Sequence, residues 1–302
     1  MSATTMDITC PDGTVVHVLG EPSLGGGPCL TLLHEYIEGW YSSPDLKVEA
    51  HARQTGDGNF ATPDDRVLYE SRTVTAHVMA HGPSRADVVA YANSLHRALS
   101  GNVTVAVDDD GVSTWARGYC QVAFDADRYR DAMPGTLTVV CDDPRRYGEF
   151  RGAYASSAPD GPGALRWADG GPRGLVFPIS FGDVAEAATA CSLHNAGTAT
   201  AHPVIAFTGA QTADVRIPWS ASVETDWGRR DMGSGELRYQ GPTGGLVVFD
   251  CLSHTASVAG VDRTRYVTGR QWPAVPAGGD LSLSLVCDSA GHIEAHIEDT
   301  YI

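Results

Sequence analysis

The sequence has 302 residues with a formal net charge of −16, and 42% of the residues are apolar while 19% are charged. This length favours two domains of roughly 150 residues, and 34 glycines with 17 prolines favour a turn-rich β protein. The net negative charge argues against a nucleic-acid-binding protein, because binding a polyanion requires lysine and arginine to neutralise phosphates.

Neither targeting signals nor cysteine motifs are evident. The first ten residues lack the basic and then apolar stretch of a secretion signal, and no run of about 18 apolar residues occurs. We therefore expect a chain that is made in the cytoplasm and is not inserted in a membrane. The seven cysteines stand far apart without a C-x-x-C pair, so buried free thiols are expected rather than a metal knuckle or a disulfide framework.

The first third of the chain is predicted to be β-rich. Short apolar or alternating runs bounded by turn residues indicate strands over 14–19, 29–33, 46–54 and 71–81. In the third of these runs, Val48, Ala50 and Ala52 alternate with polar residues, and the run ends at the turn-forming residues 55–59. The third and fourth runs are therefore expected to pair as a long-looped hairpin.

One helix is predicted after this hairpin. Ser84 is a suitable N-cap, Asp87 lies in the first turn, and Gly101 provides a C-terminal stop. The apolar residues recur at helical spacing: Val88, Ala92, Leu95 and Leu99. Further strands are expected over 103–107, 112–122 and 136–141.

The second half has a different composition. Residues 151–173 are dense in Gly, Pro, Ala and Ser and lack a hydrophobic period, which indicates a linker. From 174 to 302, strand patterns recur at roughly ten-residue spacing, which is typical of a β-sandwich. The predicted organisation is a domain over 1–150, a linker over 151–173 and a sandwich over 174–302.

Four short sequence segments, called phrases below, resemble segments of the distal tail and minor tail proteins of siphophages and follow the same order along the chain. The second half resembles that family at 175–181 (LVFPISF), at 194–209 (HNAGTATAHPVIAFTG) and at 272–281 (WPAVPAGGDL), where Val275 and Asp280 depart from the family's Leu and Asn. In the first half, 140–147 (VCDDPRRY) resembles the strand end before the linker. Within the second phrase, Asn195, Ala196 and Gly197 are expected to form a turn that tolerates positive φ, and Pro203 suits a strand start.

The resemblance implies a mainly β protein with an N-terminal β-sandwich or split-barrel-like ring domain that contains one α-helix, and a C-terminal galectin-like β-sandwich. It implies a structural role in the virion, at the tail tip, in a homo-oligomeric ring that is commonly a hexamer. The expected partners are the tail tube protein above and the tail tip hub protein below. Carboxylates such as Asp57, Asp64 and Asp65 would then line a lumen and repel DNA.

Candidate sites for chemistry are not persuasive. His292 and His296 alternate with Glu294 and Glu298, but the spacing is that of a half-exposed strand rather than the H-E-x-x-H of a zinc helix. The run from Asp108 to Gly111 lacks the glutamate that would complete a calcium loop. Carboxylate catalysis requires two carboxylates that converge across a cleft, and carboxylates that are neighbours in the sequence do not show such an arrangement. No catalytic residue, metal ligand or cofactor is predicted, and the chain is expected not to be an enzyme.

An alternative function is a host carbohydrate-binding module built on residues 174–302. Trp219, Trp227 and Tyr239 would then form an aromatic platform that contacts a surface glycan. Because aromatic residues in a sandwich usually belong to its core, the structural role remains the leading hypothesis.

Overall fold

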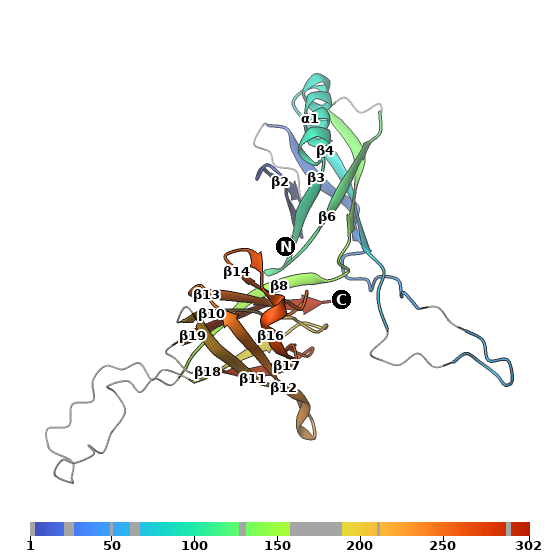
Figure 1. The fold of residues 1–302 in the computed structure, drawn as a ribbon. Coiled ribbons are helices and arrows are strands. Elements are labelled where there is room, and N and C mark those ends of the chain that lie inside the picture. Colours follow the sequence, from blue (N-terminus) through green and yellow to red (C-terminus); the bar gives the residue numbers. More distant parts are fainter. Residues whose placement is uncertain are drawn as a thin grey trace, which may run out of the picture. The chain divides into compact units, whose positions relative to one another are not determined.

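The computed structural model describes residues 4–20, 27–48, 51–60, 67–126, 131–157, 189–209, 212–287 and 291–302. The chain forms two compact units, one from 1–149 with 301–302 and one from 150–300 (Figure 1). Both are built mainly from strands, which confirms the predicted mainly β fold class. Among the described helices, none is long and apolar enough to cross a membrane.

The first unit is a closed barrel of seven strands. The strands are β1 (Thr5–Thr9), β2 (Val15–Leu19), β3 (Cys29–Glu38), β4 (Arg72–His81), β5 (Asn102–Asp109), β6 (Val112–Phe124) and β7 (Ala132–Cys141). They pair in the order β1-β2-β3-β4-β7-β6-β5 and back to β1, and only the β2–β3 pair of this ring is parallel. Closure satisfies the backbone groups that edge strands would otherwise expose.

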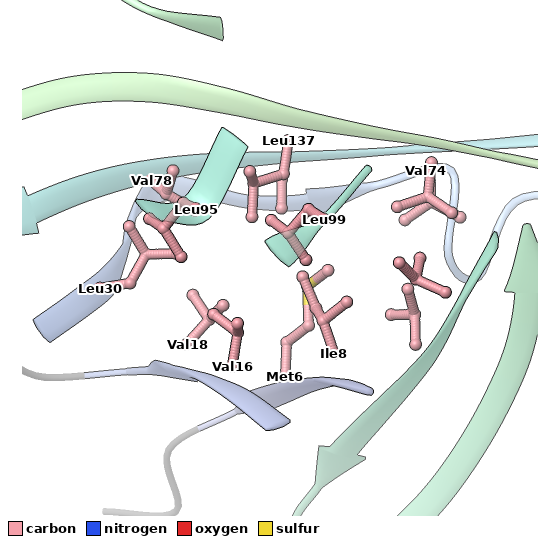
Figure 2. Close-up of a cluster of buried hydrophobic side chains, with 14 of the residues drawn as sticks. Met6, Ile8, Val16, Val18, Leu30, Val74, Val78, Leu95, Leu99 and Leu137 are labelled. Carbon is pink, nitrogen blue, oxygen red and sulfur yellow. The ribbon is translucent and has the colours of Figure 1, made fainter. Parts of the chain in front are cut away.

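The barrel interior is filled from the alternate positions of its strands and from one helix. Figure 2 shows side chains from β1 to β4 and β7 facing Leu95 and Leu99, and these residues are buried. The helix α1 (Arg85–Ala98) begins at Ser84, whose Oγ accepts a hydrogen bond from the Asp87 amide at 3.3 Å. The predicted helix, its N-cap and its buried face are therefore confirmed.

The predicted hairpin between 46–54 and 71–81 is wrong. β4 pairs with β3 and β7 instead, and several described residues between 45 and 70 bond to one another. The Lys47 amide donates to the Leu68 carbonyl at 2.7 Å, and the Phe60 amide donates to the His51 carbonyl at 3.0 Å. The alternating pattern therefore belongs to a segment that turns back on itself, and its described residues form isolated bridges rather than a strand.

The second unit is a β-sandwich, as predicted. One sheet has the order β15 (Val261–Asp262), β14 (Thr255–Val258), β13 (Leu246–Asp250), β10 (Val204–Gly209), β19 (Gly291–Tyr301) and β8 (Arg146–Ser156). The other has β16 (Val267–Arg270), β12 (Gly228–Pro242), β11 (Thr212–Thr225), β17 (Gly279–Ser284) and β9 (Ala190–Asn195), with β18 (Val286–Cys287) beside β11. Their inner faces share one core that includes Phe207, Phe249, Ile217 and Leu283.

The start of the expected linker needs correction. Residues 151–156 continue β8, because Ala155 is buried in the sandwich core and Ala153 packs against it. The low hydrophobicity of this stretch hid a strand whose inward side chains are small. Residues 158–173, and the phrase at 175–181, lie outside the described part of the chain.

Candidate functional site

Two buried arginines organise one part of the barrel unit. Arg72 opens β4 and is 1% exposed. Its Nε donates to the Pro144 carbonyl at 2.8 Å, and its Nη1 donates to the carbonyls of Gly39, Trp40 and Ser42 at 2.7, 2.9 and 2.7 Å. One guanidinium therefore joins the segment that follows β3 to the turn that precedes β8.

Arg146 lies beside the first arginine and is held mainly by aromatic faces. Its guanidinium carbon lies 5.7 Å from the Trp40 ring centroid, 4.9 Å from that of Tyr41 and 5.7 Å from that of Tyr301. Its Nη1 also donates to the Thr114 hydroxyl at 3.4 Å. Electron-rich ring faces partly replace the water that a buried cation loses.

Burial shapes the electrostatics of this pair. Desolvation, together with the charge of Arg146, lowers the pKa of Arg72 to about 10, so it stays protonated at neutral pH. Desolvation likewise lowers the pKa of Arg146. Within the described part of the chain, neither arginine makes an ion pair with a carboxylate. Carbonyl dipoles and ring faces thus hold both charges, an arrangement suited to fixing loops rather than to chemistry.

A second polar network fixes one end of the sandwich. Asn195 is fully buried, and its Nδ2 donates to the carbonyls of Ala199 and Pro276 at 2.8 and 3.2 Å. Its Oδ1 accepts hydrogen bonds from the amides of Gly197 and Thr300. The side chain therefore joins the phrase at 194–209 to the phrase at 272–281 and to β19.

Asp299 completes this network. Its carboxylate accepts from Nε and Nη2 of Arg151 at 3.0 and 2.9 Å and from the Ala196 amide at 2.8 Å. Burial raises the pKa of the Asp299 carboxyl, but the hydrogen bonds from Arg151 and Ala196 outweigh burial and hold it below its ordinary value. The carboxylate is therefore charged in the folded protein and ties β8, β19 and the 195–199 turn together.

The role predicted for Gly197 is corrected by this geometry. Its φ is not in the positive region. A Cβ at this position would instead collide with the backbone of Thr300. Glycine is needed here because two chain segments approach closely. Pro203, in contrast, does precede β10 as expected, and its carbonyl accepts from the Cys251 amide.

The three aromatic residues of the carbohydrate hypothesis do not form one surface. Tyr239 is fully buried, donates its hydroxyl to the Pro242 carbonyl at 2.7 Å and packs edge-on against Phe249. Trp219 packs partly against the core and donates Nε1 to the Gln271 carbonyl at 2.7 Å. Trp227 lies in the loop of the β11–β12 hairpin and is 98% exposed. A platform of all three is therefore excluded.

The two segments considered as metal or calcium sites form the outer face of a strand and a tight turn. His292 and His296 lie on the outer face of β19, where their rings stack on Tyr154 and Phe150 of β8. Asp110 and Gly111 take positive φ in the turn between β5 and β6. Within the described residues, no group of three or more His, Cys, Asp or Glu side chains is placed to hold a metal ion.

The cysteines are free thiols, and all seven lie within the described ranges. Cys10, Cys141 and Cys251 are buried, whereas the other four are half-buried. Burial raises the pKa of Cys120 to about 12 and that of Cys141 to about 11. Raised pKa values make these thiols poor nucleophiles.

One segment exposes apolar side chains away from the barrel core. We call the described residues between 43 and 71 the arm; within it, Leu46 is 57% exposed, Phe60 65% and Leu68 58%. The hydrogen bond from the Lys47 amide to the Leu68 carbonyl brings the backbone beside Leu46 and Leu68 together, and neighbouring exposed apolar side chains often mark an interaction surface. The arm is therefore a candidate contact surface.

Sequence comparison finds no family model that matches the chain and no curated protein that matches it. Among solved structures, the Dit protein of phage SPP1, described as a paradigm of the hub adsorption apparatus in phages that infect Gram-positive bacteria, aligns over 99% of both chains. The TM-score is 0.57 and the identity 13%. Two structures of the phage p2 baseplate in its activated conformation, with calcium and with strontium, align over 98% and 97% at TM-scores of 0.38, with 10% and 9% identity. The chain thus has the fold of the SPP1 Dit protein across both units.

Proposed function

We propose that this protein is a structural subunit of a phage tail tip and forms a distal tail ring that joins the tail tube to the tip proteins. The observation that carries the proposal is the shared fold with SPP1 Dit, which extends over both units rather than over one common sandwich. The ordered sequence phrases support the same assignment independently of the fold. A ring of six subunits is the stoichiometry that we propose.

The polar networks suit a structural role. Arg72 in the barrel unit and Asp299 in the sandwich unit both tie irregular segments to strands through several hydrogen bonds. The pKa values of both groups are shifted by this structural packing. The thiol beside Arg72, that of Cys141, is buried, and burial raises its pKa to about 11, which makes it a poor nucleophile. The proposed role is therefore assembly without catalysis, within a virion, after synthesis in the host cell.

We assign the arm to the contact between neighbouring subunits. Its exposed leucines and phenylalanine would become buried on ring closure, which supplies the hydrophobic driving force that association needs. The acidic surplus of the chain would face passing DNA, with Asp57 on the arm as one contributor. Asp64 and Asp65 lie outside the described residues.

The experiment is assembly of the purified full chain, measured by light scattering and by negative-stain electron microscopy. We expect rings from the wild-type chain and monomers from the double variant Leu46→Asp with Leu68→Asp. Val112→Asp is the matched control, because Val112 is similarly exposed but lies on the barrel at the start of β6. The assignment of the arm fails if the double variant still forms rings.

Where assembly requires the tail tube, the same three proteins are supplied to a phage that lacks its own copy. Incorporation of the wild type and of Val112→Asp into particles, with exclusion of the double variant, supports the proposal. A wild-type chain that is monomeric in solution and also absent from particles overturns it.

A further inference from the structure

Two guanidinium nitrogens of the barrel unit are buried without a hydrogen-bond acceptor among the described residues. They are Nη2 of Arg72 and Nε of Arg146. Arg72 is 1% exposed and Arg146 is 6% exposed, so bulk water does not replace the missing acceptors. A buried donor without an acceptor lowers stability, most of all when it carries charge, and a bound water or ion often supplies the acceptor. The two nitrogens therefore mark a candidate binding site.

The two guanidiniums lie close together around one tryptophan. The charge of Arg146 is one cause of the lowered pKa of Arg72. Arg72 donates from Nη1 to the Trp40 carbonyl at 2.9 Å, and the guanidinium carbon of Arg146 lies 5.7 Å from the centroid of the Trp40 ring. The Thr114 hydroxyl accepts from Nε1 of Trp40 at 3.1 Å and from Nη1 of Arg146 at 3.4 Å, which leaves its hydrogen to be donated. Hydrogen-bond donors therefore accumulate at this place.

The described carboxylates do not offset the two positive charges. Neither arginine forms an ion pair with one of them, and none is among the causes that shift the pKa of Arg72 or Arg146. The Asp109 carboxylate, which lies beside Tyr41, instead accepts from the hydroxyls of Tyr41 and Thr4 at 3.1 and 2.9 Å. Burial weakens solvent screening of the repulsion between like charges. The pair therefore favours a negatively charged acceptor over a neutral one.

The surroundings of Arg146 favour a small anion. Its guanidinium carbon lies 5.7, 4.9 and 5.7 Å from the ring centroids of Trp40, Tyr41 and Tyr301. A polyatomic anion would have to displace these rings to reach Nε. A water molecule could accept both hydrogen bonds, but it would leave the charge of the pair unbalanced. A monatomic anion such as chloride accepts hydrogen bonds from any direction and balances one of the two charges.

The candidate site lies at the base of the arm. Arg72 follows the last residue of the arm, and its Nη1 donates to the carbonyls of Trp40 and Ser42, which precede the first residue of the arm. Repulsion between the two guanidiniums opposes this arrangement. An anion that reduces the repulsion would therefore hold the two ends of the arm together more firmly.

We propose that a chloride ion binds between Arg72 and Arg146 and accepts hydrogen bonds from Nη2 of Arg72 and Nε of Arg146. This binding site goes beyond the proposed structural role and does not depend on it. Because the site requires the folded barrel, bound chloride stabilises the barrel unit against unfolding.

The direct test is anomalous X-ray scattering from crystals of the full chain that contain sodium bromide in place of sodium chloride. Bromide has the charge of chloride and nearly its size, and its anomalous signal identifies its position. We expect a bromide peak within hydrogen-bonding reach of Nη2 of Arg72 and Nε of Arg146. A bromide-containing crystal without a peak between the two arginines overturns the proposal.

The test in solution is thermal unfolding of the full chain in sodium chloride and in sodium gluconate at equal ionic strength. We expect the Tm of the barrel unit to rise with chloride as it does for one binding site, by about 3–10 °C when chloride exceeds its dissociation constant about tenfold. Arg146→Met should lose this difference between the two salts. Arg117→Met is the matched control, because Arg117 is exposed on β6, and it should keep the difference.

Each protein is compared with itself in the two salts, so a lower stability of Arg146→Met does not obscure the result. Arg146→Lys, which keeps the charge but lacks Nε, is the second variant and should weaken the chloride effect. The proposal is overturned if the wild type unfolds at the same temperature in both salts, or if Arg146→Met keeps the full difference. If neither variant folds, the bromide position in the wild-type crystal decides.

Discussion

Replacement of Arg72 by methionine tests the structural role of the buried guanidinium. The change removes the hydrogen bonds to Pro144, Gly39, Trp40 and Ser42. A hydrogen bond to a charged group contributes about 1.5–3 kcal/mol, and three N–H hydrogens serve these four carbonyls. Relief from burying a charge without a carboxylate partner offsets part of this loss. We therefore expect the barrel unit to lose about 2–4 kcal/mol.

Thermal unfolding followed by calorimetry measures this loss, which corresponds to a Tm lower by roughly 5–15 °C for a unit of this size. Hydrogen exchange should quicken first at Gly39–Ser42 and around Pro144. Arg117→Met is the matched control, because Arg117 is exposed on β6 and its loss should change stability by less than about 0.5 kcal/mol. If Arg72→Met unfolds together with the wild type, Arg72 does not hold these segments.

Three further substitutions test the cap of α1, the close approach at Gly197 and the charge of Asp299. Ser84→Ala removes the N-cap of α1 and should cost about 1 kcal/mol in urea unfolding; no change would mean that the cap is dispensable. Gly197→Ala should cost about 1–3 kcal/mol in the same assay, because the new Cβ collides with Thr300; unchanged stability would contradict the close approach. The pKa of Asp299 is depressed in the folded state, so its contribution to stability is present above the unfolded value of about 3.9 and is lost as pH falls through the folded value. Asp299→Asn should therefore lower stability at pH 7 and flatten its decline between pH 5 and 3, and a wild-type-like acid profile would refute this.

Sequence patterns correctly predicted the elements that are determined by residues close together in the sequence. The α1 helix combined a cap, a periodic apolar face and a glycine beyond its end, and all of these act within a few residues of one another. The predicted pairing of 46–54 with 71–81 was wrong because alternation of apolar and polar residues does not identify the partner strand. Of the alternating apolar residues in 46–54, Val48 is half-buried and Ala52 is exposed, so these two do not form a buried face that would fix the segment to the barrel.

The networks around Arg72 and Asp299 depend on contacts between residues far apart in sequence, which local motifs do not reveal. A signal was nevertheless present in the strand periodicity. Arg72 falls on the same face as Val74 and Val78 of β4, and Asp299 falls on the same face as Ile293 and Ile297 of β19. A charged residue at a buried position of a strand predicts a paired or hydrogen-bonded group. The identity of its partners could not be read from the strand alone.

The tryptophans show the same limit on predicting binding residues. Trp219, Trp227 and Tyr239 all belong to the β11–β12 hairpin, yet Trp227 is exposed, Trp219 is partly buried and Tyr239 is fully buried. Their difference follows from the position of each residue relative to the end of the sandwich core. That position depends on how far β11 and β12 extend beyond their partner strands.

The central claim is that this protein is part of a phage tail tip. Its most direct test is electron microscopy of purified particles labelled with an antibody raised against the full chain. We expect label at the tip end of the tail, opposite the capsid. Particles without label, or label along the tube or on the capsid, would contradict it.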